Sequence, residues 1–201
     1  MVIQPLASET ARQRVADVVE REFPSHRVLL LGDSLNCLSA MRELPDVDVA
    51  GKLTTPDNGY TAAVIGVELS NAHDAVAVKD DLNAHVDECM MLARRVPSLK
   101  HIILVIGSSD ISTRMPRGAR NHLIATCDSV SQTIQAEVEQ RVGAYVIVTI
   151  ILAGRCNDSQ LLADRVLDRV TQTEVADAAA VVLWEEIEAD SIGDVGLNQY
   201  I

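Results

Sequence analysis

Short apolar runs alternate along the chain with longer segments in which apolar residues recur at helical spacing. Four runs are typical of parallel strands buried on both faces: residues 27–31 (RVLLL), 61–67 (TAAVIGV), 101–106 (HIILVI) and 144–152. Residues 47–50 are predicted to form a weaker strand, the second of five, which ends at Gly51. The clearest helical stripe, which ends before Pro97, consists of Leu82, Val86, Cys89, Met90, Ala93 and Val96. Strands that alternate with helices predict βαβ units, and therefore an α/β fold with a parallel sheet.

Four further segments are predicted to be helical. Residues 1–25 carry an amphipathic pattern that Pro24 interrupts, and residues 35–44 end before Pro45. Residues 123–138 form a stripe with Gly143 beyond its end as a stop signal, and the last helix is expected at residues 173–188. The sequence thus predicts a helical extension (1–25), one α/β domain (26–189) and a loose tail (190–201).

Composition limits the classes of function. The chain has 201 residues, of which 48% are hydrophobic, and this is sufficient for one domain with a full core. Aromatic residues make up only 2%, so a platform that stacks the bases of single-stranded nucleic acid is not expected. The formal charge of −12 works against non-specific binding to a phosphate backbone or an anionic membrane.

The cysteines and the length of the apolar runs indicate the cellular compartment. Cys37, Cys89, Cys127 and Cys156 lie far apart, without a CxxC pair or zinc-finger spacing, so neither a disulfide framework nor a structural zinc is predicted. The longest nearly apolar run, residues 144–153, is shorter than the roughly 20 residues that a membrane helix needs. We therefore expect a soluble, intracellular (cytoplasmic) protein.

The residues Gly32-Asp33-Ser34-Leu35 follow the first predicted strand directly. Sites in open parallel sheets form at the carboxyl ends of strands, and a helix amino terminus favours negative charge there. This position suits Ser34 as a nucleophile whose own N–H group helps to bind an oxyanion. Serine at such a position is also an ordinary helix cap.

The octapeptide VLLLGDSL, residues 28–35, resembles the first conserved block of the SGNH (GDSL) hydrolase family. The resemblance extends over residues 27–188 as an ordered series of strands and helices. It implies a three-layer α/β/α sandwich with a five-stranded parallel sheet of SGNH-hydrolase, or flavodoxin-like, topology. In its loss of motifs the chain is similar to the SGNH-like domains of Oskar and of retroelement proteins.

The other family blocks are incomplete in this chain. The resemblance assigns Gly51 to the oxyanion glycine of the second block, and Ser70 stands where the third block has its oxyanion asparagine. The last block places Asp164 at the acid position, but Leu167 replaces the histidine that takes the serine proton. Loss of a triad base typically lowers the rate by ~10⁴ to 10⁶, so the resemblance implies an impaired hydrolase.

A second alignment of the blocks places the third block at residues 106–110 and the last block at residues 194–198. This alignment ranks lower, because it leaves no helix after the last block and adds a strand before the third. Both alignments replace the asparagine by serine and the histidine by a residue that is not a base.

Two histidines are candidates for a surrogate base. His73 follows the third predicted strand at the active edge, and His122 lies near the loop after the fourth. Each is also explained as an ordinary surface or packing histidine, and this interpretation is preferred.

Arg114, Arg117 and Arg120 form a local basic group near Gly118 in an otherwise acidic chain. Arginines at this edge of the sheet are candidates for binding a phosphate, a carboxylate or an RNA backbone. A solvated loop whose charges balance nearby acids is the simpler explanation. The acidic pairs at residues 80–81 and 185–186 lack the spacing of a metal site, so no metal and no cofactor are predicted.

The sequence therefore favours a non-catalytic SGNH-like domain that binds a partner, with a protein preferred and RNA disfavoured by the net charge. The alternative is a serine esterase or acetylhydrolase for small acyl esters that uses Ser34 with a non-standard base such as His73. A flavodoxin-like or receiver-type signalling domain shares the alternation of strands and helices. It is ranked last because the chain lacks the acidic cluster of a receiver and the aromatic residues of a flavin pocket.

Overall fold

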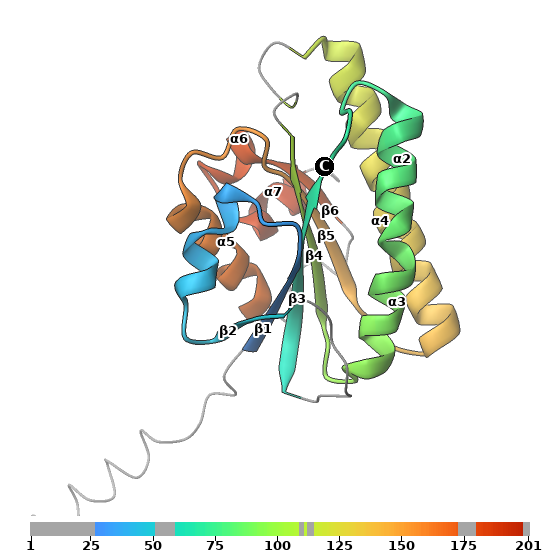
Figure 1. Ribbon diagram of the computed structural model, residues 1–201, viewed down its shortest axis with the longest axis vertical. Coiled ribbons are helices and arrows are strands. Elements are labelled where there is room, and N and C mark those ends of the chain that lie inside the picture. The colour runs from blue at the N-terminus through green and yellow to red at the C-terminus, as the bar shows by residue number, and fades with distance from the viewer. Residues whose placement is uncertain (1–26, 51–58, 109–110, 112–114, 173–179, 199–201) are drawn as a thin grey trace, which may run out of the picture.

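A computed structural model of the chain describes residues 27–50, 59–108, 111, 115–172 and 180–198. Within these residues, six strands form one parallel sheet in the order β2-β1-β3-β4-β5-β6 (Figure 1). The strands are β1 (Arg27–Gly32), β2 (Val47–Val49), β3 (Tyr60–Glu68), β4 (His101–Gly107), β5 (Ile147–Leu152) and β6 (Ala180–Leu183). The predicted α/β class is confirmed.

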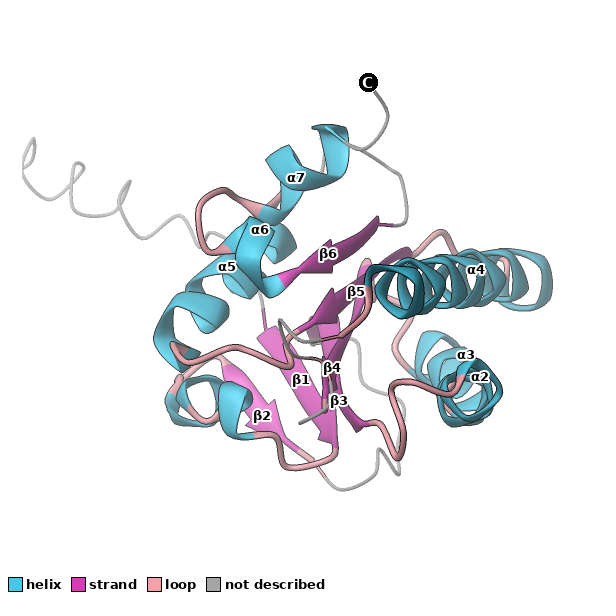
Figure 2. Ribbon diagram, turned by 90° about the horizontal axis from the view of Figure 1, so that it is seen from above, coloured by secondary structure: helices cyan, strands magenta, loops and turns pink. Residues whose placement is uncertain are grey.

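Helical segments cover both faces of the sheet, so the domain has three layers (Figure 2). One face carries α2 (Ala75–Ala84), α3 (Val86–Arg95) and α4 (Arg117–Val142). The other face carries two short 3-10 helices, η1 (Asn36–Leu38) and η2 (Ala40–Glu43), together with α5 (Ser159–Thr171), α6 (Trp184–Ile187) and α7 (Ile192–Asn198). None of the described helices is long and apolar enough to cross a membrane.

The alternation of side chains along each strand divides the apolar residues between two cores. In β1, Leu29 and Leu31 join the core under α2, α3 and α4, whereas Val28 and Leu30 join the core under η1, η2 and α5. All seven residues of β4 are buried, as expected for a central parallel strand covered on both faces. Burial on both faces explains why these strands appear as continuous apolar runs.

Two of the predicted helical stripes are confirmed with changed boundaries. The first is divided at His85 into α2 and α3, and its apolar residues Leu82, Cys89 and Met90 are buried. The second is the 26-residue helix α4, which ends at Gly143 with a left-handed φ of 71°. A glycine in this conformation terminates a helix without a steric penalty.

Among the described residues the sheet has six strands, so the prediction of five was wrong. Residues 180–183 were expected within a helix at 173–188, but they form β6, which pairs with β5, and α6 follows it directly. A run of four apolar residues satisfies a strand as well as a helical stripe, and the free edge of β5 decides between them. The predicted residues 173–179 lie outside the described part of the chain.

The segment expected to be an α-helix at residues 35–44 instead forms η1 and η2. Its backbone hydrogen bonds join residues three apart, such as Leu38 N–H to Leu35 O (3.1 Å) and Leu44 N–H to Met41 O (3.3 Å). The apolar residues also recur every third position, and a 3-10 helix with three residues per turn places them on one face. Leu35, Leu38 and Met41 are accordingly buried.

Helices α5 and α7 were not predicted. Asp158 caps α5 by accepting a hydrogen bond from Leu161 N–H (2.9 Å). Residues 190–201 were expected to be a loose tail, but Ile192 and Val195 of α7 are buried in the core under η1, η2 and α5, called here the second core. The predicted extension at residues 1–25 lies outside the described residues.

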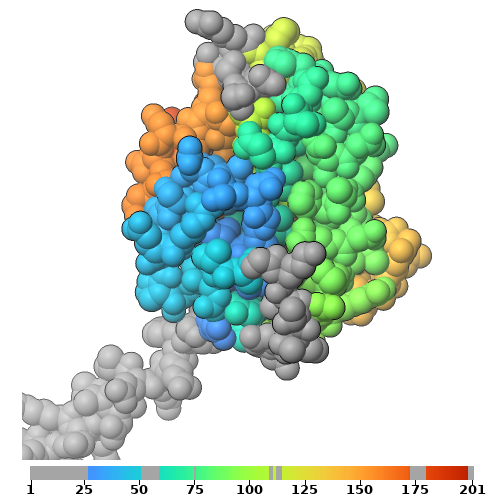
Figure 3. Space-filling model, viewed as in Figure 1, coloured from blue at the N-terminus to red at the C-terminus, as the bar shows by residue number. Residues whose placement is uncertain are grey.

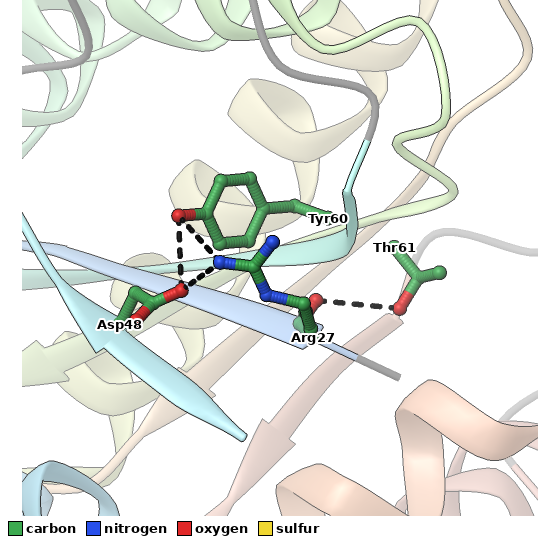
Figure 4. A network of polar contacts seen from close by, with 4 residues as sticks. All are labelled: Arg27, Asp48, Tyr60 and Thr61. Carbon is green, nitrogen blue, oxygen red and sulfur yellow. Dashed lines mark hydrogen bonds and ion pairs between the residues drawn. The ribbon is translucent and has the colours of Figure 1, made fainter. Parts of the chain in front are cut away.

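A polar network joins the amino ends of β1, β2 and β3 (Figure 4). The Arg27 guanidinium lies 4.6 Å above the Tyr60 ring and forms an ion pair with the Asp48 carboxylate, which also accepts a hydrogen bond from the Tyr60 hydroxyl (3.0 Å). The hydrogen bonds from Arg27 and then from Tyr60 lower the pKa of Asp48 below its usual value. These contacts hold the short strand β2 at the edge of the sheet.

We expect Asp48→Asn to weaken the dependence of stability on acid pH. Because the folded-state pKa of Asp48 is lowered, its stabilising effect is present above the unfolded pKa of about 3.9 and is lost as the pH falls through the folded value. Urea midpoints measured on both sides of that pKa should therefore differ less in the variant than in the wild type. Asp46→Asn, an exposed neighbour, is the matched control, and equal pH dependence in all three proteins would contradict the prediction.

Candidate functional site

The loop after β1 is held against β3 by close backbone contact. Gly32 has a φ of 79°, and a Cβ atom at this position would lie 2.2 Å from the Gly66 carbonyl oxygen. The next residue donates a hydrogen bond from Asp33 N–H to the same oxygen (2.8 Å). The glycine of the GDS sequence is therefore required by the approach of β3, independently of any chemistry at Ser34.

Asp33 lies at the switch point of the sheet, where the next two strands along the chain lie on opposite sides of β1. The chain leaves β1 for β2 on one side and then crosses to β3 on the other, so the crevice expected to bind ligands in such sheets lies between β1 and β3. At this place the Asp33 carboxylate accepts a hydrogen bond from Glu68 N–H (2.8 Å). The aspartate of the GDS sequence thus joins two strand ends and serves a structural role.

Ser34 is exposed, but nothing in the described structure activates it. Its hydroxyl group forms no hydrogen bond with any of the described residues. The following helix, η1, has only three residues and begins after Leu35, which provides no side-chain cap. The helix amino terminus that was expected to stabilise negative charge at Ser34 is therefore replaced by a single 3-10 turn.

No hydrogen bond joins His73 to Ser34 within the described residues. His73 directly precedes Asp74, the N-cap of α2, and α2 lies on the opposite face of the sheet from η1 (Figure 2). Its backbone N–H donates to the Asn71 side chain (3.0 Å), and its ring forms no hydrogen bond with the described residues. His122, the second candidate, lines a groove of about 370 Å³ beside α2 and α4. Neither ring is oriented by a carboxylate within the described part of the chain.

Ser70, at the position expected for an oxyanion donor, is engaged elsewhere. Both its backbone N–H (3.0 Å) and its hydroxyl group (2.8 Å) donate to the same carboxylate oxygen of Asp81 in α2. These two bonds fold the loop after β3 back over the helix. Gly51, the other predicted oxyanion donor, lies outside the described residues.

Asp164 lies within α5 and not in a loop before a final helix. Its exposed carboxylate accepts a hydrogen bond from the Gln160 side chain (3.1 Å), one turn earlier in the same helix. Leu167 is half-buried and packs against the second core. The expected acid position is therefore an ordinary solvent-facing position of a helix.

The second alignment of the blocks includes Gly107, which lies near the loop that carries Ser34, called here the serine loop. A Cβ atom on Gly107 would lie 2.7 Å from both the Glu68 carboxylate and the Leu35 side chain, so the end of β4 lies close to the end of β3 and to Leu35, the residue after Ser34. The last block of this alignment lies in α7, where Asp194 accepts a hydrogen bond from the Ser191 hydroxyl (2.7 Å). Residues 109 and 110 lie outside the described residues.

Cys37 is the closest thiol in sequence to the serine loop, and it lies in η1. It is buried, and this burial raises the pKa of its thiol. Burial likewise raises the pKa of Cys156, in the loop after β5, to about 12. Both side chains remain protonated thiols at neutral pH and do not replace Ser34 as a nucleophile.

A charged cluster lies at the same carboxyl edge of the sheet, beyond β4, β5 and β6. The Glu185 carboxylate forms ion pairs with Arg120 (3.6 Å) and Arg155 (3.4 Å). Arg120 was predicted as an anion-binding candidate, whereas Arg155 and the pairing of Glu185 were missed. The rule that parallel strands carry functional loops at their carboxyl ends would have indicated Arg155, which follows β5 by three residues.

The remaining predicted arginines have different outcomes. Arg117 is exposed in the first turn of α4 and forms no ion pair with the described residues, and Arg114 lies outside them. Among the described residues, no group of three or more His, Cys, Asp or Glu side chains is placed to hold a metal ion.

Comparison with known proteins leaves the geometry as the basis for function. No family model matches the chain, and neither a curated protein nor a solved structure matches it. The serine loop and the Arg120–Glu185–Arg155 cluster are the two features of the carboxyl edge to be explained.

Proposed function

We propose that this domain is a degenerate SGNH-like domain that binds a protein partner and does not hydrolyse esters. The observation that carries the proposal is the isolation of Ser34, whose hydroxyl has no hydrogen-bond partner among the described residues. The residues that the family pattern would recruit around it are used in other contacts. Asp33 binds Glu68 N–H, and Ser70 binds Asp81.

A serine hydroxyl without a base is a weak nucleophile at neutral pH. The base removes the proton as the oxygen attacks, and its loss typically lowers the rate by ~10⁴ to 10⁶. Asp164 cannot orient such a base from the middle of α5, where its carboxylate pairs with Gln160. Within the described residues, Ser34 thus has no hydrogen bond to a proton acceptor, and Asp164 does not position one.

A protein partner is favoured over RNA by charge and composition. The net charge of −12 repels a phosphate backbone, and an aromatic content of 2% provides few surfaces for stacking of bases. Within the described residues, the arginines at the carboxyl edge that form ion pairs are two, Arg120 and Arg155, and this number fits a short segment of a protein better than an extended phosphate backbone.

We expect the purified protein to hydrolyse p-nitrophenyl butyrate no faster than the buffer blank. Ser34→Ala is expected to give the same rate, because the wild-type hydroxyl is not activated. The rates are measured spectrophotometrically at neutral pH on both proteins, after far-UV circular dichroism has confirmed equal folding. Hydrolysis that disappears in Ser34→Ala would contradict the proposal and would favour the alternative, an esterase with a non-standard base.

A further inference from the structure

Three segments that are distant in sequence place charged side chains together at the carboxyl edge. Arg120 comes from the first turn of α4, Arg155 from the loop after β5, and Glu185 from α6, directly after β6. Glu185 is shared: one carboxylate oxygen faces Arg155 (3.4 Å) and the other faces Arg120 (3.6 Å). All three side chains remain 28% to 41% accessible to solvent.

Stability does not account for the arginine in α4. The amino terminus of a helix carries a partial positive charge, so an arginine there is unfavourable. The first turn of α4 nevertheless contains Arg117 and Arg120 and no acidic residue, and its N-cap, Pro116, provides no side-chain cap. Exposed ion pairs add little stability, so the pair with Glu185 compensates only in part.

The loop after β5 holds Arg155 in a rigid frame. Cys156 N–H donates to Ala153 O (2.9 Å) and closes a turn around Gly154 and Arg155. A Cβ atom on Gly154 would lie 2.4 Å from the Ile111 side chain, so this turn packs directly on the loop after β4. Arg155 is therefore positioned by the backbone before any ligand arrives.

The two neighbouring glutamates of α6 have different roles. The Glu186 carboxylate accepts a hydrogen bond from Leu183 N–H (2.9 Å) and stabilises the start of the helix. Glu185 makes no such backbone contact within the described residues, and its carboxylate pairs with the two arginines. Its carboxylate can leave them without disturbing the end of β6.

A cavity of about 280 Å³ opens beside this cluster and is lined by Arg155, Asn157, Trp184, Glu185 and Glu188. The cavity is close to the lower limit of small-ligand pockets, which begin at roughly 300 Å³, and is suited to one side chain of a partner. Trp184 provides an apolar wall, and the side-chain amide of Asn157 provides one polar group that can bind polar atoms. A partner side chain in this cavity would lie beside Arg155, and also beside the carboxylates of Glu185 and Glu188.

We propose that Arg120 and Arg155 form a clamp for the carboxylates of an acidic segment of a partner protein, and that Glu185 occupies this clamp until the segment displaces it. The inference rests on the proposed binding function. The distances of 3.4 and 3.6 Å are longer than the 2.7–2.9 Å of good charge-assisted hydrogen bonds, so the internal carboxylate is held loosely. A carboxylate from outside can approach each guanidinium more closely.

The chain provides its own reporter for this test. Trp184 is the only tryptophan of the protein, and it lines the cavity. Its emission is recorded while the full chain is titrated with an acetylated, amidated hexaglutamate peptide at about 50 mM salt, where screening between charges is moderate. We expect a saturable change in emission, and hexaglutamine should produce none.

Substitutions in the cluster are expected to change the affinity for the peptide in opposite directions. Arg155→Gln and Arg120→Gln should each weaken binding about tenfold, and Glu185→Gln, which frees both arginines, should strengthen it about threefold. Arg141→Gln and Glu137→Gln are the matched controls, because these residues form an ion pair at the other end of α4, about 30 Å away along the helix. The controls should leave the affinity unchanged.

Several outcomes would overturn the clamp. These are the absence of a saturable signal in both wild type and Glu185→Gln, equal effects of the cluster variants and their controls, or binding of a single-stranded RNA oligonucleotide in preference to the peptide. A saturable signal with inorganic phosphate alone would overturn the assignment to a protein segment. Ser34→Ala should titrate like the wild type, so a failure of the clamp is distinguishable from the discovery of Ser34-dependent hydrolysis.

Discussion

Gly32→Ala is expected to lower the free energy of unfolding by about 3 kcal/mol or more. A left-handed φ costs a non-glycine residue roughly 1–2 kcal/mol, and the new Cβ would also lie 2.2 Å from the Gly66 carbonyl oxygen. That oxygen belongs to the central strand β3 and accepts the Asp33 N–H bond, so it cannot move without loss of a backbone contact. Urea denaturation followed by circular dichroism and Trp184 emission measures the change.

Gly143→Ala distinguishes the two causes of destabilisation, the left-handed backbone conformation and the steric clash of the new Cβ atom. Gly143 also has a left-handed φ, of 71°, but a Cβ atom there would meet nothing within 4 Å. Its replacement should therefore cost only the conformational part, about 1 kcal/mol. If Gly32→Ala were no more destabilising than Gly143→Ala, the close approach of the serine loop to β3 would be wrong.

Leu38→Ala is expected to cost about 2–5 kcal/mol, in the range of large-to-small substitutions in a close-packed core. Leu38 is fully buried in η1, and its side chain lies against Gly66 of β3. The 3-10 segment is therefore held by its apolar side chains and not by helical propensity. In the space-filling view, the blue segment with η1 and η2 lies beside the orange segment with α5 (Figure 3), which forms the other side of the same core.

Asn36→Ala is the control for this prediction, because Asn36 is exposed in the same 3-10 turn. A surface substitution of this kind should change stability by less than about 0.5 kcal/mol. The urea midpoints of both variants are compared with the wild type. Similar midpoints for Leu38→Ala and Asn36→Ala would show that η1 does not depend on the core.

Together these substitutions test whether the GDS residues are structural in this protein. Gly32 and Asp33 have contacts that explain them without catalysis, through Gly66 and Glu68. A structural explanation predicts that stability depends strongly on Gly32, while Ser34→Ala changes neither stability nor hydrolysis. A catalytic explanation predicts a loss of activity in Ser34→Ala.

The sequence alone determined the strands with continuous apolar runs and the longest amphipathic helix. β1, β3, β4 and β5 are buried on both faces, so nearly every position must be apolar, and this pattern is visible without any partner. Helix α4 was recognised because its stripe is long and ends at Gly143. The α/β class follows from the alternation of these elements.

Only the tertiary structure decided the short or ambiguous segments. Residues 180–183 have the composition of a strand or of a helix, and pairing with β5 makes them β6. Residues 35–44 have good helical residues, but burial of Leu35, Leu38 and Met41 at a spacing of three produces 3-10 turns. Local propensity is a small energy for such segments, and the packing of a few side chains outweighs it.

The surroundings of Ser34 and the arginine cluster also depended on the tertiary structure. A motif identifies the serine, but the sequence does not show that Asp33 bonds to Glu68, that Ser70 bonds to Asp81, or that Asp164 lies within a helix. Arg120, Arg155 and Glu185 belong to three separate segments, and the parallel sheet brings them together because the carboxyl ends of its strands share one edge. Sequence patterns record periodicity within one element, whereas a site formed by several loops exists only after the strands have paired.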